Sequence, residues 1–389
     1  MNICFASFRA FPDGRARQPF PESDPANIAY ALDGTYYSFY TLKKLSPRQL
    51  RALLQPYDLV ITELTTVAVD LVSRIVAACD GRAATYSEGH IADYEQLTPY
   101  HQVVWTQILR SAAINFVYWE RYVPFYRALT PRPVEYLPYP YLLDHARRSF
   151  VPLAQRPSLV AVPTGLAGQT RNGLASLVVA KQLLEAGLVQ RLACWLEPDS
   201  FEQDARAIAA FLFSKPMPPP TRQITWRRWL LKWRADYRLL LQLKTQLGIQ
   251  PTARSVIQSD PVFFYRRTGW LAYLAQLAPA RIIIDLNNRE TVGRNALDCA
   301  ALGIACVSTA RTDMQARLFP YTTLSDSWDV QGAYALCQRL LRDVCFYQQV
   351  IDYAAEAIQQ FDVASFRARF AALGARYPEI EALGGIRRV

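Results

Sequence analysis

The chain has 389 residues, of which 51% are hydrophobic and 20% are charged, and this composition excludes a disordered or fibrous protein. The length exceeds what one compact core ordinarily organises, so we expect two domains. A formal net charge of +10 favours anionic partners, among them nucleotides, phosphorylated molecules, nucleic acid and an acidic membrane face.

Several features that the sequence lacks argue against a membrane-spanning, secreted or zinc-binding protein. No apolar run approaches the ~20 residues that span a bilayer, and residues 1–8 lack the basic start and long apolar core of a secretory signal, so we expect a cytoplasmic protein. Seven cysteines, an odd number without a C-x-x-C pair, are expected to be reduced and mostly buried thiols. With only three histidines, a zinc site is not expected.

Short apolar runs alternate with helical patterns in the first part of the chain. They predict strands at residues 2–7, 57–62, 83–86 and 114–118, and helices at residues 67–79, 100–112 and 120–129. Such alternation is typical of a parallel sheet with helices on both faces. Residues 8–34 are rich in proline and predict a long loop instead.

The loop after the first predicted strand carries Arg9, Arg15 and Arg17. In a doubly wound domain it would lie over the carboxyl edge of the sheet, where ligands bind. Two interpretations stay open: the arginines hold an anionic acceptor, or they are solvated and partly offset by Glu22 and Asp24. The loop has no glycine-rich dinucleotide fingerprint, which argues against a nicotinamide enzyme.

A second loop with candidate chemistry follows the strand at residues 83–86. It contains Glu88, Gly89 and His90, and it lies at the carboxyl end of a strand, where active-site loops gather. His90 is therefore a candidate catalytic residue. The alternative is a histidine that is hydrogen-bonded at the surface.

Residues 134–144 contain two prolines and predict an extended connector out of the first domain. Residues 159–163 then predict the first strand of the second domain. The loop after this strand contains Gly165 and Gly168, and Arg171 stands at the start of a helix that runs to about residue 186. A cation at a helix start suits a phosphate ligand, so we expect Arg171 to contact phosphate; the alternative is that Arg171 caps a surface turn.

The segment after the strand at 191–196 and the helix at 201–213 has an unusual composition. Residues 215–221 are proline-rich and predict a stiff linker. Residues 225–248 combine a stripe of Trp, Tyr and Leu at helical spacing with many Arg and Lys. This helix would either pack in a core with a solvated basic side or bind an anionic membrane or nucleic acid.

Residues 281–308 form the unit around which the second domain is organised. After a predicted strand at 255–258 and a predicted helix at 261–277, residues 282–284 predict a strand that is buried on both faces. A polar loop follows, then a helix from about Gly293 to Gly303 and a buried strand at 304–307. Residues 330–377 are expected to be helical.

The start of the helix at Gly293 has the features of an anion site. Its backbone N–H groups are unpaired, the helix dipole favours negative charge there, and Arg294 adds a cation. Glu290 precedes this helix start, and Asp298 lies one turn inside it, on the same face as Arg294. By spacing alone, Arg294 and Asp298 could also be a solvated ion pair, with Glu290 an ordinary loop charge.

Glu290 and Asp298, separated by seven residues and followed by Gly303, resemble the Glu, seven residues, Glu signature of retaining GT-B glycosyltransferases of family four. Gly293 matches the early glycine of that signature. The second acid is Asp rather than Glu, and Ala305 replaces a proline. The resemblance implies that Glu290 faces the donor sugar and that Asp298 binds the ribose of the nucleotide.

The same resemblance extends to other segments. The connector at 134–144 is similar to the interdomain crossing of these enzymes, and His90 resembles by position a cleft histidine that their first domain supplies. The family places an arginine and then a lysine at the donor diphosphate. Arg171 resembles the lysine, whereas the arginine has no counterpart. The last helix would cross back to the first domain.

Together these features predict an α/β protein of two Rossmann-like domains facing across a cleft, with boundaries at 1–145, 146–361 and a crossing segment at 362–389. The resemblance implies a hexosyltransferase that moves a sugar from a nucleotide-sugar donor to an unknown acceptor with retention, and the net charge of +10 is compatible with an anionic acceptor. Gly168, Arg171, Gly293 and Arg294 would bind the donor, so no metal or cofactor is expected. The alternatives are a glycosyltransferase acting on nucleic acid, a non-catalytic binding protein, and peripheral contact with a membrane.

Overall fold

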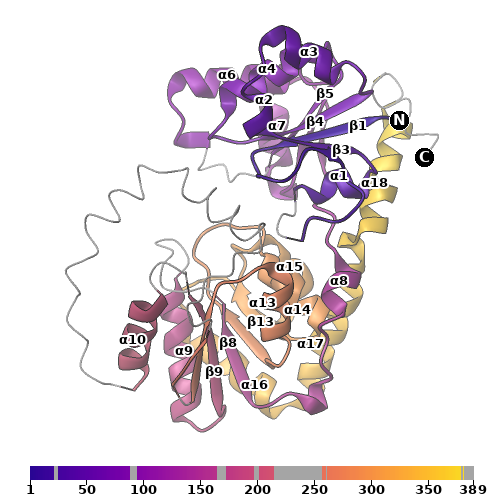
Figure 1. Ribbon diagram of the computed structural model, residues 1–389. Helices are drawn as coiled ribbons and strands as arrows, with labels where there is room; N and C mark the ends of the chain where they lie inside the picture. The colour runs from indigo at the N-terminus through magenta and orange to yellow at the C-terminus, as the bar shows by residue number, and fades with distance from the viewer. Residues whose placement is uncertain are drawn as a thin grey trace.

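The structure is a computed structural model, and it describes residues 1–21, 25–87, 94–163, 172–196, 201–213, 256–259, 261–377 and 380, without the side chains of 257–259. Figure 1 shows two sheets with helices around each, one above the other. The α/β class and the two-domain architecture predicted from the sequence are confirmed. The expected helix at 225–248 and its linker lie outside the described residues, as do His90, Gly168 and Arg171.

The described part of the first domain contains a seven-stranded sheet in the order β2-β3-β1-β4-β5-β6-β7. Its neighbouring strands are parallel except β2 and β3, which are antiparallel. The strands are β1 (Ile3–Ser7), β2 (Gly14–Arg15), β3 (Thr35–Ser38), β4 (Leu59–Leu64), β5 (Ala83–Ser87), β6 (Ile114–Val117) and β7 (Val134–Tyr136). The helices are α1 (Asn27–Ala31), α2 (Phe39–Leu42), α3 (Pro47–Leu54), α4 (Val69–Ala78), α6 (Pro99–Ser111), η1 (Glu120–Tyr122) and α7 (Val123–Leu129).

The described part of the second domain repeats this plan, with the order β10-β11-β9-β8-β12-β13-β14. Only the pair β10 and β11 is antiparallel among these strands. The strands are β8 (Leu159–Val162), β9 (Arg191–Leu196), β10 (Val256–Ser259), β11 (Val262–Arg266), β12 (Ile282–Asp285), β13 (Ala305–Thr309) and β14 (Thr323–Leu324). The helices are α8 (Leu143–Arg147), η2 (Leu153–Gln155), α9 (Gly173–Glu185), α10 (Phe201–Leu212), α13 (Trp270–Leu277), α14 (Arg294–Leu302), α15 (Asp313–Leu318), η3 (Pro320–Thr322), α16 (Val330–Arg342), α17 (Val344–Ala357) and η4 (Ile358–Phe361).

Each sheet is buried on both faces, as continuous apolar strands require. All residues of β1, β4 and β12 are buried, so helices must cover both sides of these strands. The order of the second sheet reverses at β8, which has β9 on one side and β12 on the other. In open parallel sheets the crevice at the carboxyl ends of such strands is where ligands bind. The segment after β12 is therefore placed at the switch point.

The chain passes between the domains twice, and the two crossings lie side by side. The N–H of Tyr141 donates to the carbonyl of Phe361 over 2.8 Å, and Tyr141 forms a parallel bridge with Asp362. The last helix, α18 (Val363–Arg376), then runs up along the first domain (Figure 1). Phe366 and Phe370 of α18 belong to the hydrophobic core of that domain. Helix α18 thus returns to the first domain.

The structure corrects several local expectations. Residues 261–277, predicted as one helix, contain the strand β11 and only then the helix α13, so that prediction was wrong. Residues 8–34 were predicted as a loop and include β2 and α1. The strand β3 and the helix α3 were not predicted. Helix α3 begins with a capping box formed by Ser46 and Gln49, and this start signal can be recognised in the sequence.

Candidate functional site

The candidate site begins where β12 ends, at the loop of residues 286–292 and the start of α14. Gly293 is the N-cap of α14 and has φ +89°, a left-handed conformation that only glycine adopts without strain. A Cβ at this position would lie 2.0 Å from Cγ2 of Thr312. Glycine is therefore required both by the backbone and by the close approach of Thr312.

The loop that carries Glu290 is held from two directions. On one side, the N–H groups of Asp313 and Met314 donate to the carbonyls of Thr291 and Val292 over 3.0 and 2.9 Å. On the other, the side-chain amide of Asn287 donates to Oγ1 of Thr291 over 3.2 Å. These bonds fix the backbone on the C-terminal side of Glu290, so the carboxylate is presented from a defined position.

The Glu290 carboxylate lies where the two domains meet. Its Oε2 accepts a hydrogen bond from the hydroxyl of Tyr122 and lies 3.4 Å from Nη2 of Arg121, both on the first domain. The Glu290 side chain is 26% exposed, so part of it still faces solvent. Burial, and secondarily the hydrogen bond to Glu290, raises the pKa of Tyr122, so the phenol keeps its proton and remains a donor.

Arg294, the first residue of α14, reaches toward the first domain as well. Its Nη2 donates to the carbonyl of Pro21 over 3.1 Å, and its guanidinium lies 4.6 Å from the ring centroid of Trp270. Pro21 belongs to the proline-rich loop after β1. The cation of the second domain is therefore placed next to the loop in which we expected an acceptor to sit.

Asp298 is buried, with 1% of its surface exposed. Its Oδ1 accepts hydrogen bonds from the hydroxyl of Tyr141 over 2.8 Å and from Nε1 of Trp270 over 2.9 Å. The interpretation of Asp298 and Arg294 as a solvated ion pair was wrong, because the Asp298 carboxylate is buried against Tyr141 and Trp270. The contact of Asp298 with a ribose stays a prediction.

Sequence reasoning missed Arg121, Tyr122, Tyr141 and Trp270. Arg121 and Tyr122 follow the carboxyl end of β6, and that position, where ligand-binding loops gather, was the available signal. Trp270 was assigned to the middle of an expected helix and is instead the first residue of α13. Of the predicted site residues, the structure brings Glu290, Gly293, Arg294 and Asp298 together around one helix start; the positions of the other three are not described.

The described residues also bear on the other site types considered. Within them, no group of three or more His, Cys, Asp or Glu side chains is placed to hold a metal ion. The cysteines are free thiols, and all are buried except Cys345. In the described part of the chain, no helix has both the length and the apolarity that crossing a bilayer demands.

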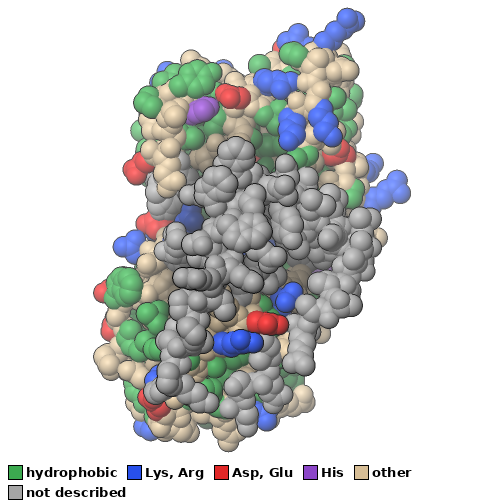
Figure 2. All heavy atoms as spheres, turned by 60° about the vertical axis from the view of Figure 1, so that its left-hand side comes forward, with side chains coloured by type: hydrophobic (Ala, Val, Ile, Leu, Met, Phe, Trp, Pro, Cys, Tyr) green, Lys and Arg blue, Asp and Glu red, His purple; other side chains and the backbone are tan. Residues whose placement is uncertain are grey.

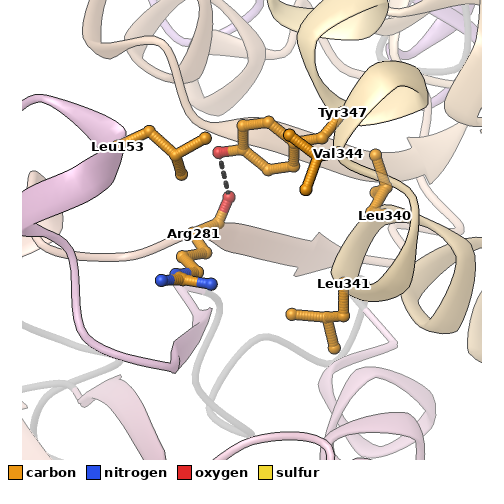
Figure 3. Close-up of a pocket in the computed structure, with 6 residues that line it drawn as sticks. All are labelled: Leu153, Arg281, Leu340, Leu341, Val344 and Tyr347. Atoms are coloured by element: carbon orange, nitrogen blue, oxygen red, sulfur yellow. Dashed lines mark hydrogen bonds between the residues drawn. The ribbon is translucent and has the colours of Figure 1, made fainter.

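A small cavity lies at the opposite end of β12 (Figure 3). It measures about 40 Å³, which is room for water rather than for a sugar. The hydroxyl of Tyr347 donates to the carbonyl of Arg281 at its edge. The lining residues are Leu153, Arg281, Leu340, Leu341, Val344 and Tyr347. Since Arg281 precedes β12 and Glu290 follows it, this cavity is separate from the candidate site.

No family model and no curated protein matches the sequence, whereas solved structures match the fold over its whole length. The chain is similar to an α,α-trehalose 6-phosphate synthase from Burkholderia multivorans, with a TM-score of 0.62, 12% identity and coverage of 100% of this chain and 99% of that one. A sucrose-phosphate synthase from Thermosynechococcus elongatus gives a TM-score of 0.61 at 13% identity, with coverage of 97% and 99%.

A third match is an α,α-trehalose-phosphate synthase from Burkholderia xenovorans in complex with glucose-6-phosphate, with a TM-score of 0.58, 10% identity and coverage of 95% and 99%. All three neighbours consist of two Rossmann-like domains in the GT-B arrangement. Identity at this level establishes the architecture and leaves the chemistry to the site itself. The chain therefore has the GT-B fold.

Proposed function

We propose that this protein is a glycosyltransferase that moves a sugar from a nucleotide-sugar donor to a phosphorylated acceptor, with retention of configuration at the transferred sugar. The observation that carries the proposal is the place of Glu290. It precedes the start of α14 at the switch point of the second sheet, and side chains of the first domain reach its carboxylate.

The proposed chemistry is electrostatic. As the bond to the donor sugar breaks, negative charge grows on the leaving diphosphate. The positive end of the α14 helix dipole and the guanidinium of Arg294 would stabilise that charge. Gly293 permits the left-handed N-cap conformation from which α14 starts. Glu290 would face the sugar, and Arg171, from outside the described residues, would supply a second cation.

The acceptor is proposed to be a sugar phosphate. The structural neighbours are named as synthases of phosphorylated sugars, and one of them was solved in complex with glucose-6-phosphate. On the face drawn in Figure 2, several Lys and Arg side chains gather on one side of the upper half, which is the first domain. Of the arginines expected to hold the acceptor, Arg15 pairs with Asp33, and the guanidinium of Arg9 lies over the ring of Phe8.

The test is a transfer assay with the full chain. UDP-, GDP- and ADP-linked glucose would each be incubated with glucose-6-phosphate, and the release of nucleoside diphosphate would be followed together with the anomeric configuration of the product by NMR. We expect release that depends on the acceptor and a product with the configuration of the donor. Donor binding without release would favour a non-catalytic binding protein, and binding to RNA or DNA with a steep dependence on salt would favour a nucleic-acid substrate.

A further inference from the structure

Residues 119–122, Trp-Glu-Arg-Tyr, connect the first domain to the second at the candidate site. Oε2 of Glu120 lies 2.8 Å from Nη2 of Arg317. Arg121 contacts Glu290 and also donates to the carbonyl of Arg311 over 3.5 Å. The hydroxyl of Tyr122 donates to Glu290. We refer to residues 119–122 as the interdomain segment.

The side chains of the interdomain segment pack against one another. The rings of Trp119 and Tyr122 stack at a centroid distance of 5.4 Å. The guanidinium of Arg121 lies 4.7 Å from the Trp119 ring centroid and 5.3 Å from that of Tyr122. Trp119 is 2% exposed, so it anchors the segment in the first domain. The two donors that face Glu290 are therefore held in place by aromatic contacts before any ligand arrives.

This arrangement supplies Glu290 with a neutral donor and a cation from the opposite domain. Two such donors restrict the rotamers of a carboxylate. Both donors belong to the first domain, so they hold Glu290 only while the domains are together. A movement that separated the domains would release it.

We propose that Tyr122 and Arg121 are positioning residues, which orient the Glu290 carboxylate toward the donor sugar and do so only while the two domains are in contact at this site. The inference rests on the proposed function for its kinetic consequence. Its structural part, that Tyr122 sets the orientation of the Glu290 side chain, can be examined without turnover.

The decisive variant is Tyr122→Phe, which removes one hydroxyl and keeps the ring that stacks on Trp119. Its matched control is Glu120→Gln, which weakens the contact of the same segment with Arg317 and does not touch Glu290. We expect Tyr122→Phe to lower kcat about tenfold or more while KM for the donor changes little, because a hydrogen bond to a charged group is lost. For Glu120→Gln we expect kcat within about twofold of the wild type, since the Glu120 side chain is exposed.

The double variant Tyr122→Phe/Glu290→Gln shows whether Tyr122 acts on catalysis through Glu290 or independently of it. If Tyr122 acts through Glu290, then Tyr122→Phe should add little to the loss already caused by Glu290→Gln. Multiplied losses would overturn the inference, as would equal losses in Tyr122→Phe and Glu120→Gln.

Crystal structures of the same variants give a readout that does not depend on activity. The Glu290 side chain should adopt another rotamer in Tyr122→Phe and keep its place in Glu120→Gln. An unmoved carboxylate in Tyr122→Phe would overturn the inference even for a protein without transferase activity. Absence of turnover in the wild type with every donor would instead count against the proposed function.

Discussion

The hydroxyl of Tyr122 donates to the carboxylate of Glu290, although the two residues are 168 positions apart in the chain and belong to different domains. A candidate active-site carboxylate is thus held by the domain opposite to its own. In a protein built of two domains, this makes the site dependent on how the domains meet as well as on either sheet.

Glu290→Gln tests the role of this carboxylate at the donor sugar. The amide keeps the size of the side chain and loses its charge, so we expect kcat to fall about 100-fold or more. The free energy of unfolding should change by less than about 1 kcal/mol, because the side chain is partly exposed. The assay is diphosphate release, with urea denaturation for stability. Glu356→Gln, at an exposed position of α17, is the control, and a wild-type rate in Glu290→Gln would remove the role.

Arg294→Ala tests the cation at the start of α14. We expect the affinity for a nucleoside diphosphate to weaken by about 1 to 3 kcal/mol, the contribution of a hydrogen bond to a charged group. Calorimetric titration measures it directly. Arg342→Ala, which removes an exposed cation at the end of α16, should leave the affinity unchanged. Equal affinities of Arg294→Ala and the wild type would place the diphosphate elsewhere.

Gly293→Ala tests the close approach at the N-cap of α14. We expect a loss of about 2 to 4 kcal/mol in the free energy of unfolding, from the left-handed backbone and from the overlap with Thr312. Thr312→Ser removes the Cγ2 that the new methyl group would meet. Gly293→Ala should therefore lower the free energy of unfolding less in the Thr312→Ser background.

Gly187→Ala separates the two causes of this loss. Gly187 also has a positive φ, of +65°, and a Cβ there would meet nothing within 4 Å. Its substitution should therefore cost only the backbone part, about 1 to 2 kcal/mol. Urea denaturation of the four variants gives the comparison. If Gly293→Ala lowered the free energy of unfolding equally in the wild type and in the Thr312→Ser background, the overlap with Thr312 would not be a cause of the loss.

Arg156→Met tests a buried cation that joins several segments of the second domain. Arg156 is 3% exposed, and its guanidinium donates to the carbonyls of Val151, Ala280, Leu302 and Gly303. The last two end α14, the helix that begins at the candidate site. Burial lowers the pKa of Arg156. A methionine in its place has no N–H group to donate to these carbonyls.

Because buried carbonyls would lose their donors, we expect Arg156→Met to reduce the free energy of unfolding by about 3 to 5 kcal/mol. Urea denaturation measures this loss. Arg148→Met, at an exposed position, should change stability by no more than about 0.5 kcal/mol. A loss below about 1 kcal/mol at Arg156 would mean that water replaces the guanidinium.

Local patterns predicted the unit around β12 and α14 well. The apolar run at 282–284 became β12, and Gly303 ends α14 in a left-handed conformation with φ +64°, as a glycine after the last helical residue indicates. The prediction for residues 261–277 failed because a short apolar run, such as 262–265, suits a helix and a buried strand equally. The first part of this segment is a strand because it pairs with β9 and β10. The pairing with β9 joins residues that are far apart in the chain.

In the candidate site, too, some features follow from the local sequence and others only from tertiary packing. The order of strand, polar loop, glycine and arginine marked the start of α14 as an anion site, because unpaired N–H groups and a helix dipole are properties of one short segment. That Asp298 is buried against Tyr141 and Trp270, and that Tyr122 reaches Glu290, follows from packing between segments that sequence spacing does not relate. Chain folding brings such groups together, so only the assembled domains show which side chains surround each acid.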